Sequence, residues 1–231
     1  MLSNSGMSIS SESTGRTYGG ESLADRQAKR RQKFMAAGHE LFGTVGFRQT
    51  TVRLLCKQAE LTDRYFYESF GSIEDLLAAV YQQAIDQLQQ QVLQAVLAER
   101  QAEQMIERGL DAFFRVAECP QTARIVWLEV LGVSSRIDQA YNSALRNFSQ
   151  LFSQLTLSIY PNLALTAEEI QILAIGAIGA VSQATMAWLL SDYQASRQTM
   201  IKSIKPILMG LVLYVQQQSP NSATSRLSNE A

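Results

Sequence analysis

Apolar side chains recur at intervals of three and four residues through most of the chain, and this period is typical of helices. Residues 24–45 carry one such stripe, formed by Phe34, Ala37, Leu41, Phe42 and Val45. Proline, which breaks helices, accounts for only 4 of 231 residues, and long β-branched runs are scarce. The sequence therefore predicts an all-α protein.

Glycine, proline and capping residues divide the pattern into segments. Ser72 and Asp75 have the spacing of a capping box at the start of a long helix. Pro206 lies inside the last pattern and is expected to kink that helix or to mark a wrong boundary. The expected helices are 24–45, 51–58, 62–70, 72 to about 100, 102–118, 121–134, 137–159, 166–190 and 196–217.

The charge is unevenly distributed along the chain. Residues 26–67 contain nine Lys or Arg against three acidic residues, a net charge of +6, although the whole chain has a net charge of −1. Residues 82–231 contain ten basic and twelve acidic residues. This asymmetry indicates a small anion-binding module joined to a larger part that does not select its partners by charge.

Two short helices joined by a three-residue turn lie within the basic segment, as a DNA-binding helix-turn-helix requires. Phe66 and Phe70 are expected to face the core, which leaves the polar side of the second helix free to enter the major groove. An ordinary helical hairpin with a solvated basic face is the alternative. The expected DNA-binding residues are Arg48, Thr50, Thr51, Arg53, Lys57, Thr62, Asp63, Arg64, Tyr65 and Tyr67.

Different roles are expected within this set. Arg64 could make a bidentate contact with a guanine, and Tyr65 could contact a thymine methyl group or a base edge. Phosphate contacts, which fix register without reading sequence, are expected from Arg48, Thr50, Thr51 and Tyr67. Arg53 and Lys57 are expected to lie over the DNA backbone or to pair with nearby acids.

Several short motifs punctuate residues 30–81: Phe34-Met35, Ala37, Leu41-Phe42, Gly46-Phe47, Thr51-Val52, Ala59, Tyr65-Phe66-Tyr67, Phe70 and Leu76-Leu77. In these motifs the segment resembles the N-terminal DNA-binding domain of the tetracycline-repressor (TetR) family. The resemblance implies an all-α homodimer that represses transcription and leaves its operator when a small ligand binds. The chain departs from the family pattern at Glu60, Arg64, Ser69 and Ile73, where the family often has Gly, a small residue or Gly, His and Lys.

These observations predict four parts. Residues 1–22, which contain seven Ser and four Gly, form a disordered extension. Residues 23–71 form the helix-turn-helix domain, residues 72–217 a helical effector-binding and dimerisation domain, and residues 218–231 a disordered tail.

The run from Ile170 to Leu190 carries no charge and would be ~32 Å long as a helix, enough to cross a bilayer. Its flanks are acidic, with no cluster of Lys or Arg, and no second span exists, which opposes a membrane location. A helix apolar all round then indicates a subunit interface. The expected homodimer interface comprises Gly176, Ala180, Ala184, Ile204, Leu208 and Leu211, on two helices from each subunit. The two helix-turn-helix domains of such a dimer (its two heads), related by a two-fold axis, would bind half-sites about 34–36 Å or more apart.

The middle helices, within residues 102–159, are rich in aromatic side chains with scattered charges. They could enclose a pocket for a small, largely apolar effector, and plain core packing is the alternative. A ligand there would move the long helix that begins after Ser72 and so change the spacing of the two heads. The expected pocket residues are Phe113, Phe114, Arg124, Trp127, Tyr141 and Phe148.

Residues needed for catalysis or metal binding are sparse. His39 is the single histidine, which excludes most His-based metal sites and any Ser-His or Cys-His catalysis that does not use this residue. The sequence has no P-loop, Gly-rich dinucleotide motif or nucleophile elbow. We expect no enzyme activity, no metal and no cofactor, and two isolated cysteines without a signal peptide indicate the cytoplasm. An effector-independent architectural DNA-binding protein and a helical enzyme or carrier remain the alternatives.

Overall fold

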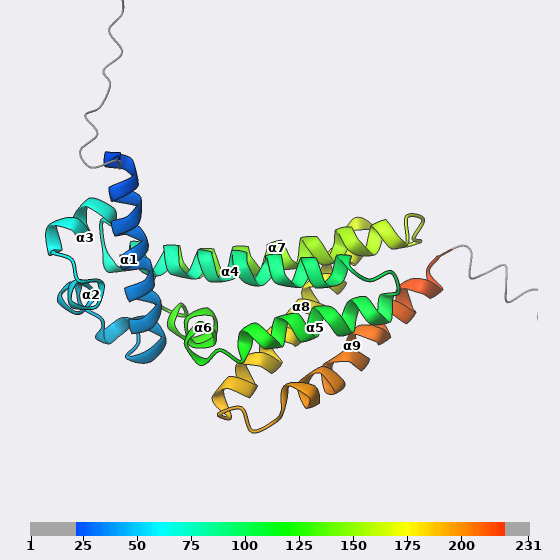
Figure 1. The fold of residues 1–231 in the computed structure, drawn as a ribbon. Coiled ribbons are helices and arrows are strands. Elements are labelled where there is room, and N and C mark those ends of the chain that lie inside the picture. The colour runs from blue at the N-terminus through cyan, green and yellow to red at the C-terminus, as the bar shows by residue number, and fades with distance from the viewer. Residues whose placement is uncertain (1–21, 220–231) are drawn as a thin grey trace, which may run out of the picture.

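The computed structural model describes residues 22–219, and every secondary-structure element in that range is helical (Figure 1). The expected all-α class is confirmed. The two expected disordered tails lie almost entirely outside the described residues. At their inner edges, Ser22 caps the first helix by accepting a hydrogen bond from the Asp25 backbone N–H, and Gln218 caps the last one.

Three helices form a small domain at one end of the molecule: α1 (Leu23–Thr44), α2 (Val52–Ala59) and α3 (Asp63–Ser69), with a 3₁₀ turn η1 (Phe47–Gln49) before α2 (Figure 1). Three side chains at the centre of its core, Phe34, Leu55 and Phe66, have no exposed surface. Phe34 from α1 meets Phe66 from α3 edge to face, with ring centroids 5.3 Å apart. Leu55 from α2 is buried in the same cluster, so the apolar stripes found in the sequence meet here.

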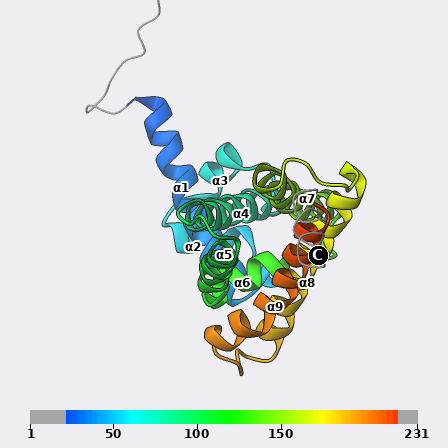
Figure 2. The same cartoon turned by 90° about the vertical axis from the view of Figure 1, so that its right-hand side faces the viewer.

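α4 (Ile73–Leu97) leads from this domain into a larger one, which also contains α5 (Ala102–Ala117), α6 (Pro120–Arg124), η2 (Ile125–Glu129), α7 (Ser135–Ile159), α8 (Ala167–Leu190) and α9 (Arg197–Gln217). α4 packs against α5 and α7, α5 against α9, α9 against α8, and α8 against α7. These five helices therefore close into a ring, which Figure 2 shows nearly end-on.

The structure interrupts one of the expected helices and leaves another continuous. The expected helix 121–134 is a short α6 followed by the π-helical turn η2, where the consecutive Ile125, Val126 and Trp127 are all buried. Single π turns inside helices often occur at functional sites. α9 continues through Pro206, so the proline does not mark a wrong boundary of the expected helix 196–217.

α1 and α6 approach each other closely at Gly43. A Cβ added at this position would lie 2.5 Å from the Gln121 Cβ and 2.7 Å from its Cα, so α6 would have to move. We expect Gly43→Ala to destabilise the protein by about 1–3 kcal/mol, seen as a lower midpoint of thermal unfolding. An uncrowded helical Gly→Ala change stabilises by roughly 0.5–1 kcal/mol, so a raised midpoint would contradict this contact.

Candidate nucleic-acid interface and ligand cavity

The turn between α2 and α3 sets the angle of the second helix. Thr51 begins α2, where its hydroxyl accepts a hydrogen bond from the Leu54 backbone N–H at 3.3 Å. Glu60 ends α2 in the left-handed region, with φ 55° and ψ 42°. A glycine would adopt this conformation without strain, so the glutamate keeps the turn at a small conformational cost. The result is a helix-turn-helix with α3 as its second helix.

α3 has one buried and one exposed side. Phe66 and Phe70 are buried, as the sequence predicted. Thr62, Asp63, Arg64 and Tyr67 are exposed. The Arg64 side chain is 83% exposed and its Nε lies 3.0 Å from the Glu68 carboxylate. Its guanidinium is thus accessible, with only a solvent-screened pair inside the same helix to give up.

Tyr65 is half-buried and projects less freely than the sequence suggested. The guanidinium of Arg30 lies 3.8 Å from the centre of its ring, and Arg30 also pairs with Glu68 at 3.5 Å. The next residue, Arg31, lies over the Phe70 ring and donates to the Ser69 carbonyl at 3.0 Å. Two arginines of α1 therefore hold α3 in place. From the sequence, these two arginines contributed only to the net charge of the basic segment, and their contacts with α3 were not predicted.

The remaining predicted residues surround the start of α2. The structure leaves Arg48, Thr51, Arg53 and Lys57 exposed. Thr50 differs, because its side chain is buried and its hydroxyl donates to the Gly46 carbonyl at 2.8 Å. The expected phosphate contact from the Thr50 hydroxyl is therefore corrected to a structural role in the turn.

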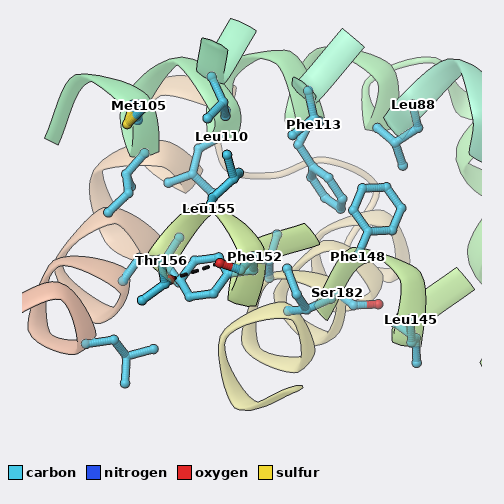
Figure 3. A pocket seen from close by; sticks show the side chains of 18 of the residues that line it. Leu88, Met105, Leu110, Phe113, Leu145, Phe148, Phe152, Leu155, Thr156 and Ser182 are labelled. Carbon is cyan, nitrogen blue, oxygen red and sulfur yellow. Dashed lines mark hydrogen bonds between the residues drawn. The ribbon is translucent and has the colours of Figure 1, made fainter. Parts of the chain in front are cut away.

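The ring of helices in the larger domain encloses a cavity of about 190 Å³, far more than the roughly 10–15 Å³ that one water molecule needs. In Figure 3, Phe113 from α5 and Phe148 from α7 point toward each other across it. Trp127 and Tyr141 also line the cavity, as expected. No Asp, Glu, Lys, Arg or His lies among the described lining residues.

Two expected pocket residues lie elsewhere. Phe114 has no exposed surface and packs edge to face on Trp188, with centroids 5.7 Å apart, because it points away from the cavity that its neighbour Phe113 lines. Arg124 donates from a guanidinium nitrogen to the Thr44 carbonyl at 2.6 Å, at the boundary with α1. The sequence could not separate these cases, because adjacent helical residues point about 100° apart and the inward direction depends on tertiary packing.

Some polar groups of the cavity wall bind other parts of the protein. The Trp127 indole N–H donates to the Ser182 hydroxyl at 3.2 Å. Thr156 donates to the Phe152 carbonyl at 2.9 Å, drawn as a dashed line in Figure 3. The hydroxyls of Tyr81 and Tyr141 have no hydrogen bond to any residue that the structure describes. Burial strongly raises the pKa of Tyr81, and the nearby Tyr141 raises it further.

Residues 34–80 match the family described as bacterial regulatory proteins of the tetR family. This segment includes the helix-turn-helix described above, so the chain carries the DNA-binding domain of that family. No curated protein sequence matches it.

Solved structures of transcriptional regulators share the fold of this chain. The fatty acid degradation regulator FadR from Bacillus halodurans has a TM-score of 0.69 at 16% identity, covering 78% of this chain and 95% of its own. FadR from Bacillus subtilis, solved in complex with stearoyl-CoA, has a TM-score of 0.66 at 17% identity, covering 77% and 96%. A TetR-family regulator from Pectobacterium atrosepticum has a TM-score of 0.63 at 19% identity, covering 84% and 97%.

The protein leaves an apolar face of α8 and α9 unpacked. Ile172, Ile175 and Gly176 are exposed on α8, and Ile207 and Leu213 on α9. A Cβ at any of the three glycines of this face would meet nothing within 4 Å: Gly176, Gly179 and Gly210. Among the described residues, α8 alone is long and apolar enough to cross a membrane by length and composition, and 28% of its most apolar window is buried.

The predicted interface residues divide between this face and the core. Gly176 lies on the face, and Ala180 and Ala184 are half-buried at its edge. Ile204 and Leu208 are buried inside the protomer, and Leu211 lines the cavity. The α9 part of the expected interface is therefore corrected. α9 has apolar stripes on two sides, and the sequence does not say which one meets the protomer's own core.

A polar junction joins η2 to the helix-turn-helix domain. The Glu129 carboxylate accepts from the Phe47 backbone N–H at 2.7 Å and from the Arg124 Nε at 2.6 Å. Gly46, with φ 92°, lies against both side chains, and a Cβ there would come within 2.8 Å of the Arg124 guanidinium. The same turn supplies Val126 and Trp127 to the cavity. One turn of helix thus contacts both functional regions.

Further contacts strengthen this boundary. His39 lies 3.0 Å from the Thr122 hydroxyl. On the other side, Arg136 of α7 binds Asp75 at the start of α4 at 2.6 Å. The hydrogen bond from Arg136, followed by that from Ser72, lowers the pKa of Asp75. These contacts join α1 to α6 and the start of α4 to α7.

Proposed function

We propose that this protein is a cytoplasmic homodimeric repressor that binds a palindromic operator and leaves it when a small, largely apolar molecule fills the cavity. One observation carries the proposal. η2 lines the cavity with Val126 and Trp127 and, two residues on, binds η1 through Glu129. A ligand that displaces the cavity wall has a direct mechanical route to the DNA-binding domain. The stearoyl-CoA complex of the FadR neighbour supports an apolar effector.

The DNA contacts that we propose follow the exposed side of α3. Arg64 would leave Glu68 for a guanine edge, and Tyr67 and Thr62 flank it on the same helix. Phosphate contacts would come from Arg48, Thr51, Arg53 and Lys57, which surround the start of α2. Tyr65 would contact a base through its exposed edge only, because Arg30 covers its ring.

The dimer that we propose forms through the exposed face of α8 and α9. Paired with a second copy, this face makes a four-helix interface, and its glycines allow the backbones to approach closely. Effector binding favours one arrangement of the two heads only to the extent that the ligand binds that arrangement more tightly. Residues 23–71 would then act as the reading domain and residues 72–217 as the sensing and pairing domain.

Selection of bound sites from a random duplex library tests the proposal with the full chain. A two-fold symmetric consensus is expected, because a symmetric dimer places two identical α3 helices on the DNA. The absence of enrichment would contradict sequence-specific binding, and an asymmetric consensus would contradict the dimer.

Arg64→Ala is expected to weaken binding to the selected site by about 1–3 kcal/mol and to relax preference at one base pair in each half-site. Arg48→Ala is the matched control, because losing a phosphate contact weakens all duplexes more evenly. Fluorescence anisotropy with the consensus and with single-base variants measures both effects. Unchanged specificity in Arg64→Ala would remove this residue from the reading surface.

A further inference from the structure

Given that the cavity is the effector site, as proposed above, we propose that its ligand is an uncharged, unbranched lipid whose oxygen-bearing head binds Tyr81 and Tyr141 at the closed end. The chemical class is a long-chain fatty alcohol, aldehyde or alkyl ester, with the alkyl tail directed toward the open end.

The wall excludes charge from the interior. No described lining residue is charged, and the hydroxyl of Ser182 is already bonded to the Trp127 indole N–H. An ionised carboxylate placed there would have no cation to pair with, and burying an unpaired charge is far more costly than burying a neutral oxygen that finds a donor. The interior therefore selects for a neutral ligand.

The cavity extends along much of α4. On α4 its lining residues run from Tyr81 to Val96, about 22 Å along one helix. An extended alkyl chain, with C–C bonds of about 1.5 Å, advances roughly 1.3 Å per carbon, so about 16–18 carbons match this length. A compact ring system of similar volume would leave one end of the cavity empty.

The two ends differ in exposure. Tyr81 is 1% exposed, whereas Ile159, which lines the end remote from the helix-turn-helix domain, is 40% exposed. We therefore place the opening at the Ile159 end. A ligand that enters there can bury either its head or its tail at the tyrosine end.

The tyrosine hydroxyls decide the direction. Those of Tyr81 and Tyr141 have no hydrogen-bond partner among the described residues and face an apolar cavity, so a ligand oxygen there would be the partner that they lack. The raised pKa of Tyr81 means that its hydroxyl keeps its proton and can donate. A ligand oxygen satisfies these donors, whereas a methyl terminus leaves them unpaired.

In the opposite arrangement the alkyl tail would lie at the tyrosine end and a charged head, such as that of an acyl-CoA, would remain in solvent at the opening. That head would meet unfavourable charge. Glu99 and Glu103 flank the connection from α4 to α5, and Glu168 and Glu169 begin α8 beside the lining residue Ile170. Arg108 pairs with Glu99 at 3.4 Å and Lys205 pairs with Glu103 at 2.8 Å, so Glu168 and Glu169 are the carboxylates left to act on a ligand there. An anionic head beside the start of α8 would be repelled by these two groups.

Four probes with the same 16-carbon chain test the inference on the full-length protein: 1-hexadecanol, methyl palmitate, palmitate and palmitoyl-CoA, each below its aggregation threshold. Quenching of tryptophan fluorescence gives the affinities, and operator anisotropy gives release. We expect the alcohol and the ester to bind at least about tenfold more tightly than palmitate or palmitoyl-CoA in mildly alkaline buffer. Palmitate should gain affinity as acid protonates it.

Tyr81→Phe and Tyr141→Phe should each lower hexadecanol affinity by about 3- to 10-fold and leave binding of headless hexadecane unchanged. Thr156→Val is the matched control, because the Thr156 hydroxyl is already bonded to the Phe152 carbonyl. Thermal unfolding of each variant without ligand verifies folding.

Equal or tighter binding of palmitate or palmitoyl-CoA would overturn the neutral-head assignment and leave the proposed repressor function standing. Failure of all four probes and of hexadecane to bind would overturn the apolar effector itself. If the tyrosine variants bind hexadecanol as the parent protein does, the head does not lie at the closed end.

Discussion

Ile175→Glu is expected to separate the dimer and to abolish operator binding. Ile175 is 51% exposed on α8, next to Gly176, which has open space above its Cα. In a symmetric interface the substitution would place two carboxylates in an apolar contact, and burying unpaired charge costs several kcal/mol for each group. Operator affinity should fall by at least about 100-fold, because one helix-turn-helix contacts only a half-site.

Sedimentation velocity measures the oligomeric state, and anisotropy measures operator binding. Leu97→Glu is the matched control, because Leu97 is an exposed apolar residue at the end of α4, away from the proposed interface. Circular dichroism should be unchanged in both variants. A dimeric Ile175→Glu protein with parental affinity would mean that the copies pair through another surface.

The sequence predicted the fold well because helical periodicity and capping are local signals. Ser72 accepts a hydrogen bond from the Asp75 backbone N–H at the start of α4, as the spacing predicted. The reciprocal bond expected of a capping box goes to the Ser72 hydroxyl instead of its backbone. Phe66 and the C-cap residue Phe70 are four positions apart, so both lie on the side of α3 that faces the core.

The site was predicted less completely, because direction within a helix depends on tertiary partners. Phe113 and Phe114 are equally aromatic, yet only Phe113 reaches the cavity. Arg124 looked like a polar group for a ligand, and the structure uses it at the boundary between domains. The π turn that brings Arg124 and Glu129 together has no local sequence signal that periodicity can detect.

The junction gives the clearest prediction about regulation. Glu129→Ala should leave ligand affinity close to the parent value and largely abolish ligand-induced release from the operator. The Glu129 side chain is 14% exposed and holds both the Phe47 N–H and the Arg124 guanidinium. Without the Glu129 carboxylate, a movement of Val126 or Trp127 in the cavity wall is no longer transmitted to η1.

Allosteric coupling is typically worth a factor of about 5–150 in affinity, and we expect Glu129→Ala to reduce that factor to at most about threefold. Operator affinity measured with and without saturating 1-hexadecanol gives the factor directly. By linkage, the operator must change ligand affinity by the same factor, so the reverse titration is an internal check. Glu118→Ala is the matched control, because Glu118 pairs with Arg197 between α5 and α9, away from the junction.

The result separates two routes from the cavity to the DNA. α4 begins at the helix-turn-helix domain and lines the cavity with Tyr81, so it offers a route that does not pass through η2. If Glu129→Ala keeps full release, the signal travels along α4, and Asp75 with its partner Arg136 becomes the contact to change next. If release is lost while ligand still binds, the π turn is the element that both sites bias, because it alone among the described elements contacts the cavity with one side chain and the η1 backbone with another.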